Sequence, residues 1–166
     1  SGQRTKRNAA ISLGAEEIML ARGDSLVRLN AVERIRFDDG TIAFDAGPAS
    51  VYRLYQAALG REPDAGGLGY WVERTDEGAS LRELAQAFIG SGEFRDRFGE
   101  NLDDEAFVGR LYENVLGREA DRAGLLHWSD TLEQGAARAD VLTDFANSPE
   151  NISRTANATD DGVWYV

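Results

Sequence analysis

The feature that most constrains this chain is an internal repeat with a period of 57 residues. The stretch LGREPDAGGLGYW, Leu59 to Trp71, returns as LGREADRAGLLHW, Leu116 to Trp128. Laid over each other without a gap, residues 51–94 and 108–151 agree at 17 of 44 positions. A unit that recurs at a fixed period cannot bury its apolar face alone, so we expect the two copies to stack around a shared core.

The first copy predicts four amphipathic helices. Apolar residues recur at helical spacing from Val51 to Leu59, with Ser50 suited to the N-cap and Gly60 to the left-handed C-terminal position. A capping box, Ser80 with Glu83, starts the third helix. The predicted apolar faces comprise Val51, Leu54, Tyr55, Ala58 and Leu59; Leu68, Trp71 and Val72; Leu81, Leu84, Ala85, Phe88 and Ile89; and Phe94 with Phe98.

The second copy repeats these steps. Its first helix runs from Phe107 to Leu116 before Gly117, and Ser148-Pro149 starts its fourth. Ala137 stands where the first copy has its capping serine, so the third helix loses that cap. We expect a helical domain over residues 48–157, with repeats at 50–99 and 107–154.

Residues 9–47, before the repeats, read as strands. Val32 to Phe37 nearly alternates apolar and charged residues, and Asp38-Asp39-Gly40 joins it to Thr41–Phe44 as a hairpin. Ile18–Ala21 and Ser25–Leu29 form a second predicted hairpin. The fold class is therefore α+β and mainly α, a small N-terminal antiparallel sheet followed by two stacked four-helix repeats. Residues 158–166 form a tail that ends in strand-forming residues.

The repeated motif has a structural interpretation. Its glycines end helices, its aspartates cap the next helix, and its tryptophans pack inward. Its arginines pair either with Glu62 or Glu119 or with a late carboxylate such as Glu93 or Glu150. These motif residues are Gly60, Arg61, Asp64, Gly67 and Trp71, with Gly117, Arg118, Asp121, Gly124 and Trp128 in the second copy.

The motif also has a ligand-binding interpretation. Tyr70 with Trp71, and His127 with Trp128, could each offer an aromatic platform to a sugar, with Tyr70 and His127 as the more exposed members. Calcium is the alternative ligand, although it needs six to eight oxygens and the EF-hand spacing is absent. The candidate metal ligands are Asp24, Asp38, Asp39, Asp64 and Asp121.

Composition excludes several classes of function. The chain has 18 basic and 29 acidic side chains, a formal net charge of −11, which disfavours nucleic acid and anionic membrane surfaces as partners. No apolar run approaches the roughly 18 residues of a membrane helix, so we expect no membrane insertion. Cysteine is absent, His127 is the single histidine, and no nucleophile, paired-histidine or phosphate-loop motif is present. We expect no catalytic residues.

Three resemblances add to this reading. LYQAALGREPDAGGLGYW, followed by AQAFIGSGEF, resembles the bacterial domain-of-unknown-function family 4214, and the second copy matches it with Ala120 for the proline and Asn151 for the phenylalanine. Arg22 to Asp45 resembles the strand-rich end segment of repeat-in-toxin (RTX) proteins, the calcium-dependent cargo of type I secretion. The last residues resemble the end of a type I secretion signal: Asp160, Asp161, Val163, Trp164, Tyr165 and Val166.

These resemblances imply a C-terminal module of a secreted protein that is extracellular or on the cell surface. Its partners would be the type I secretion machinery, a β-roll upstream in the parent protein, and cell-envelope or matrix polysaccharide. We expect a non-catalytic module for surface attachment or carbohydrate binding. The alternatives are a structural and export module that caps a calcium-binding β-roll, and an accessory domain of a secreted enzyme. Calcium is expected in the parent protein, and no other cofactor.

Overall fold

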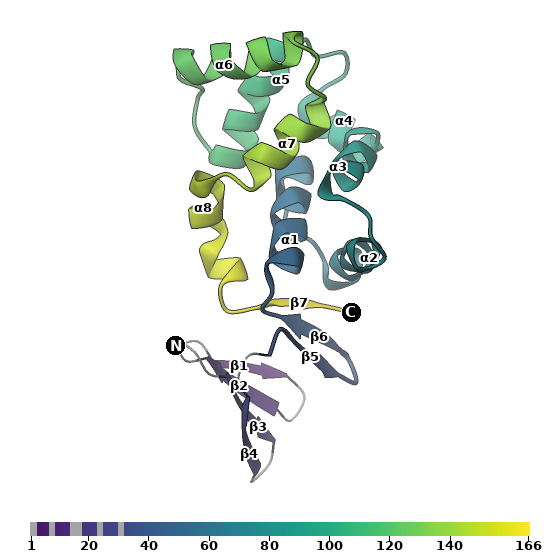
Figure 1. Cartoon of the computed structure of the whole chain (residues 1–166), viewed down its shortest axis with the longest axis vertical. Coiled ribbons are helices and arrows are strands. Elements are labelled where there is room, and N and C mark those ends of the chain that lie inside the picture. Colours follow the sequence, from purple (N-terminus) through teal and green to yellow (C-terminus); the bar gives the residue numbers. More distant parts are fainter. Residues whose placement is uncertain (1–2, 7–8, 14–17, 23–24, 30–31) are drawn as a thin grey trace.

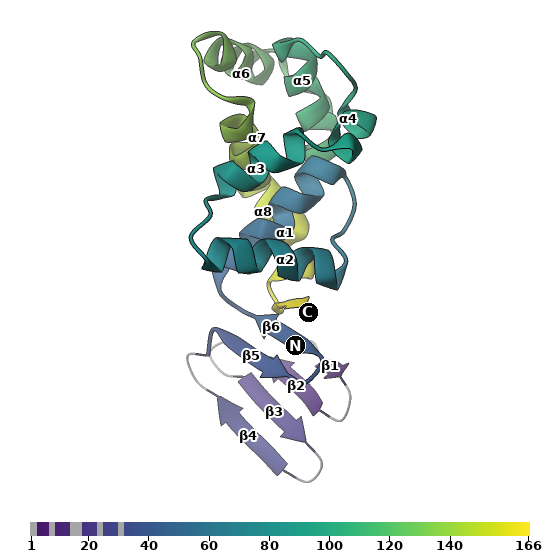
Figure 2. The same cartoon turned by 90° about the vertical axis from the view of Figure 1, so that its right-hand side faces the viewer.

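The fold was determined as a computed structural model, which describes residues 3–6, 9–13, 18–22, 25–29 and 32–166. Helices occupy one end of the molecule and strands the other (Figures 1 and 2). This arrangement confirms the expected class, a mainly helical α+β fold.

The helices follow the repeat. The first copy forms α1 (Ala46–Leu59), α2 (Ala65–Asp76), α3 (Leu81–Ile89) and α4 (Gly92–Phe98). The second forms α5 (Asp104–Leu111), the π-helix η1 (Tyr112–Leu116), α6 (Arg122–Glu133), α7 (Arg138–Ala146) and α8 (Pro149–Thr159). The first helix of the second copy, expected to be one regular helix, thus changes its winding at Tyr112.

Most predicted helix caps are present. Ser80 and Glu83 form both hydrogen bonds of the capping box, and Ser148 caps α8 with Pro149 in its first turn. The prediction that Ser50 caps α1 is wrong, since α1 begins at Ala46 with Asp45 as N-cap residue. The first turn of a helix has backbone N–H groups without helical partners, so it accommodates Pro48.

Helix α1 is the centre of the core. Val51, Leu54, Ala57 and Ala58 are all buried, and α1 packs against α2, α3, α7 and α8. Helix α7 of the second copy also packs against α3 of the first. The two copies therefore share one core, which encloses most of the α1 surface, including the buried side chain of Arg53.

The strands form two sheets, whereas the sequence suggested one. The first sheet is antiparallel, with β1 (Gln3–Lys6), β2 (Ala9–Leu13), β3 (Ile18–Arg22) and β4 (Ser25–Leu29) in that order. The second has the order β5 (Arg34–Phe37), β6 (Gly40–Ala43), β7 (Val163–Tyr165). Both predicted hairpins, β3–β4 and β5–β6, are confirmed. The residues of the β3–β4 turn lie outside the described residues.

Strand β7 brings the end of the sequence back to its beginning. Thr41 of β6 pairs with Tyr165, and Ala43 pairs with Val163. The tail therefore completes the second sheet, directly below α1 and α2 in Figure 1. Strand β7 therefore lies between β6 of the sheet and α2 of the first repeat.

Candidate functional site

A groove of about 540 Å³ lies between the β5–β6–β7 sheet and α2. It combines two tyrosines and a phenylalanine with charged and hydroxyl side chains and several glycines. It is lined by Arg36, Phe37, Gly40, Thr41, Gly66, Gly69, Tyr70, Glu73, Asp76, Tyr165 and Val166. Ligand sites of proteins are concave and combine apolar walls with a few polar groups in this way.

The groove exists because β7 docks closely on α2. The backbone N–H of Val166 donates to the carbonyl oxygen of Ala65 at 3.1 Å. A Cβ atom placed on Gly69 would lie 1.9 Å from the Val166 carbonyl oxygen, so a side chain there would prevent this approach. The second copy has Leu126 at the matching position, and that leucine is 53% exposed. Gly69 therefore distinguishes the first copy from the second, because it allows β7 to pack closely on α2.

Arg34 holds the sheet to the helices at one end of the groove. Its guanidinium donates to Asp45 at 3.1 and 3.0 Å, and to both carboxylate oxygens of Asp76 at the end of α2. The Arg34 guanidinium holds the pKa of Asp76 below its usual value. The Asp45 carboxylate thus accepts hydrogen bonds from Arg34 and none from the backbone N–H groups of α1.

The two side chains of the first predicted aromatic pair differ in burial. Trp71 is partly buried, packs against the helical core and lies 4.7 Å from the Phe88 ring. Tyr70 is 56% exposed, meets Trp71 edge to face at 5.0 Å and lines the groove. The structure therefore offers Tyr70, rather than Trp71, to a ligand.

The second predicted pair lies far from the groove. Trp128 packs 5.2 Å from Phe145, and His127 is exposed with its ring 5.1 Å from Trp128. Both are on α6, at the opposite end of the helical body from the sheets (Figure 1). The two aromatic pairs therefore do not form one surface.

The two motif aspartates sit at helix starts. Asp64 and Asp121 are the N-cap residues of α2 and α6, and each accepts a backbone N–H, from Gly67 at 2.8 Å and from Gly124 at 2.9 Å. These backbone hydrogen bonds hold the pKa of each carboxyl below its usual value.

The candidate calcium ligands that the structure describes do not gather at one place. Asp38 and Asp39 form the β5–β6 turn, apart from the two capping aspartates, and Asp24 lies outside the described residues. Within residues 32–166 and the described parts of β1–β4, no three acidic or histidine side chains gather closely enough to hold an ion. Calcium needs six to eight oxygens, so these residues supply too few at any one place.

The two motif arginines make duplicate contacts. Arg61 donates to both carboxylate oxygens of Glu93, at 2.6 and 3.2 Å, and Arg118 to those of Glu150 at 2.8 and 2.9 Å. Each guanidinium also lies over a tyrosine ring of its own copy, Tyr55 or Tyr112. These bidentate pairs join the loop after the first helix to the start of the fourth.

The tail residues take up separate structural positions. Asp160 ends α8, Asp161 lies in the following turn, and Val163, Trp164 and Tyr165 form β7. The Trp164 ring lies 5.9 Å from that of Phe37 across the sheet. Phe37 and Tyr165 were missed as groove residues, because only the pairing of β7 with β6 brings them near Tyr70. The near alternation of apolar and charged residues in Val32–Phe37, which predicts a strand, was the one sequence pattern that pointed to Phe37.

Comparison with known proteins agrees with the helical repeat. The sequence model of one family, described as a domain of unknown function (DUF4214), matches residues 49–88 and 85–155. No curated protein matches the chain. Among the described residues, no helix has the length and apolar character needed to cross a membrane.

Proposed function

Because the chain belongs to the DUF4214 family, whose function is unknown, we propose from the chemistry of its groove that it is a non-catalytic carbohydrate-binding module. The observation that carries this proposal is Tyr70, 56% exposed on a groove that also presents Phe37 and Tyr165. A tyrosine offers an apolar ring face and a polar hydroxyl at little conformational cost, which suits the mixed surface of a sugar.

The polar groups of the groove suit a neutral sugar. Glu73 supplies hydrogen-bond acceptors for hydroxyl groups, Arg36 supplies donors, and both Asp76 oxygens already accept from Arg34. With two carboxylates, one guanidinium and a chain charge of −11, the groove repels polyanions. The proposed ligand is therefore a neutral polysaccharide of a cell envelope or matrix. A secreted module that attaches its parent protein to such a surface fits this chemistry.

The groove proposal is tested by binding to a glycan array, followed by calorimetry with the best neutral oligosaccharide. Tyr70→Ala removes the exposed ring without opening the core, so we expect binding at least about tenfold weaker with an unchanged melting temperature. His127→Ala, at the equivalent position of the second copy, is the matched control and should bind as the wild type does. Equal loss in both variants, or no array signal, would refute the proposal.

A second function is favoured by the tail, namely export through type I secretion with residues 160–166 as the signal. The supporting observation is that the tail forms β7 as the final strand of a sheet, so it can be read while extended and fold afterwards. Deleting residues 160–166 should then abolish export. The control Gly69→Leu leaves the tail sequence intact but blocks its docking, and should still be exported. Export of the deletion variant would exclude this function.

A further inference from the structure

The duplication draws attention to a pocket beside α8, the fourth helix of the second copy. In the first copy, Phe94 and Phe98 of α4 are buried and their rings stack at 4.1 Å. The residues 57 positions later are Asn151 and Thr155 of α8, both buried as well. Two rings are thus replaced by two small polar side chains, and a pocket of about 330 Å³ lies beside them.

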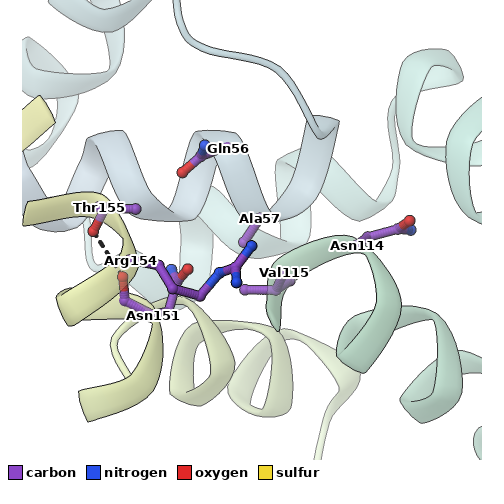
Figure 3. Close-up of a pocket in the computed structure, with 7 residues that line it drawn as sticks. All are labelled: Gln56, Ala57, Asn114, Val115, Asn151, Arg154 and Thr155. Carbon is purple, nitrogen blue, oxygen red and sulfur yellow. Dashed lines mark hydrogen bonds between the residues drawn. The ribbon is translucent and has the colours of Figure 1, made fainter. Parts of the chain in front are cut away.

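The pocket lies where the two copies meet. Gln56 and Ala57 of α1, Asn114 and Val115 of η1, and Asn151, Arg154 and Thr155 of α8 line it (Figure 3). Arg154 reaches between α1 and η1, with its guanidinium beside Ala57 and Val115. The pocket therefore has a cationic group within it and amides and a hydroxyl around it.

Two of its donors have no protein acceptor. Arg154 is exposed and makes no hydrogen bond or salt bridge with another described residue, although its charge is attracted to that of Glu150. Glu150, one helical turn before it, is engaged by both hydrogen bonds from Arg118. The side-chain nitrogen of Asn114, at the opposite end of the pocket, is buried and also lacks an acceptor. The exposed Arg154 guanidinium can therefore pair with a ligand carboxylate, and only the buried Asn114 nitrogen carries the cost of a missing acceptor.

Part of the role of Arg154 is structural. A Cβ atom on Gly117 would lie 2.8 Å from an Arg154 guanidinium nitrogen, so the guanidinium lies over the end of η1. Arg97 of the first copy occupies the same place over Gly60, but Phe94 and Phe98 fill the space beside it. The two copies therefore share the arginine and differ in the pocket, which gives an internal control.

We propose that this pocket binds a small hydroxylated carboxylate, such as a sugar acid. One guanidinium matches one planar carboxylate with two parallel hydrogen bonds, and the Gln56 and Asn114 amides suit ligand hydroxyl groups. Asn151 and Thr155 already donate to backbone carbonyl oxygens. A single positive charge in a chain of net charge −11 favours a monoanion over a phosphate dianion. The volume is at the lower end of ligand sites, about 300–1,000 Å³, so the ligand is one sugar-sized unit.

The proposal is independent of the groove, which lies on α2 and the sheet. It is tested by calorimetry and amide NMR shifts with D-glucuronate, with D-glucose and inorganic phosphate as comparisons. We expect saturable binding of glucuronate, with shifts at η1 and α8, and binding about tenfold weaker or less for the other two. No saturable glucuronate binding, or equal binding of phosphate or glucose, would overturn it.

Three variants locate the binding. Arg154→Gln should weaken glucuronate binding about tenfold or more, because it removes a charge-assisted hydrogen bond. Arg97→Gln removes the equivalent arginine of the first copy, beside which Phe94 and Phe98 are buried, and should leave binding unchanged. Asn151→Phe with Thr155→Phe restores the phenylalanines of the first copy and should abolish binding. If that double variant does not fold, the comparison of the two arginine variants still decides. Equal effects of Arg97→Gln and Arg154→Gln would refute the assignment.

Discussion

Single glycines at the ends of α1 and η1 fix both backbone direction and packing. Gly60 and Gly117 have φ of 62° and 67°, in the left-handed region that residues with a Cβ disfavour. An arginine of the fourth helix of the same copy lies directly over each glycine. Two separate constraints thus require glycine at these positions.

Replacing Gly60 with alanine should therefore destabilise the fold. A Cβ atom there would lie 1.7 Å from Arg97, so the arginine must move in addition to the backbone strain. We expect a loss of about 1–3 kcal/mol in the free energy of unfolding, measured by urea denaturation. Gly109→Ala is the control, since a Cβ atom there meets nothing within 4 Å in the middle of α5, and it should be neutral or stabilising. A stable Gly60→Ala variant would contradict this account.

The Arg61–Glu93 pair makes a pH-dependent contribution to stability. Arg61 holds the pKa of Glu93 below its usual value of 4.5. Because the folded pKa is the lower one, the stabilisation is present above about pH 4.5 and is lost as pH falls through the folded pKa. Glu93→Gln should lower the melting temperature at pH 7 by about 1–3 °C, since the pair is half exposed.

The pH dependence supplies the check on this pair. The difference between wild type and Glu93→Gln should shrink as the pH is lowered toward the acid limit, followed by scanning calorimetry. A difference that stays constant from pH 7 downward would show that the carboxylate charge is not the cause.

Local sequence patterns predicted the contacts of single residues at helix ends well. The capping pairs and glycine ends are contacts within three or four residues, which a pattern can reveal. The cap of α1 was placed wrongly at Ser50, because Gly47-Pro48 resembled a boundary and instead lies inside the first turn. The arginine pairs were predicted only with alternatives, since a separation of 32 residues carries no local signal.

At the scale of elements, Arg34 connects the second sheet to the helical body. It bonds Asp45 just before α1 and Asp76 at the end of α2. Arg34→Ala should loosen β5–β6–β7 from α2 and lower stability by about 1 kcal/mol, with faster amide exchange in β6 and β7. Arg74→Ala, which breaks an exposed pair with Glu77 within α2, is the control and should leave that exchange unchanged. Unchanged exchange in both variants would exclude the connection.

Two elements escaped prediction for a common physical reason. The π-helical turn of η1 arises in a segment whose apolar spacing matches that of α1, so the pattern could not distinguish them. The groove beside Tyr70 depends on β7, whose partner strand lies near the other end of the sequence. Such packing is decided by tertiary contacts that periodicity does not contain.

For the whole molecule, the net charge of −11 is the dominant electrostatic property. Self-repulsion of a charged fold is relieved by divalent cations, whatever their identity. Among the described residues no carboxylate cluster favours one ion. Millimolar Ca²⁺ should therefore raise the melting temperature no more than equal Mg²⁺, measured by differential scanning fluorimetry. A large shift with Ca²⁺ alone would reveal a specific calcium site.

The pairing of β6 with β7 has a consequence for how the chain acquires its fold during synthesis. Thr41 leaves the ribosome long before its partner Tyr165 does. Until then one edge of β6 is unpaired, and α2 lacks its contact with β7, whose close approach requires glycine at position 69. Along that side the nascent protein therefore stays open until β7 has emerged.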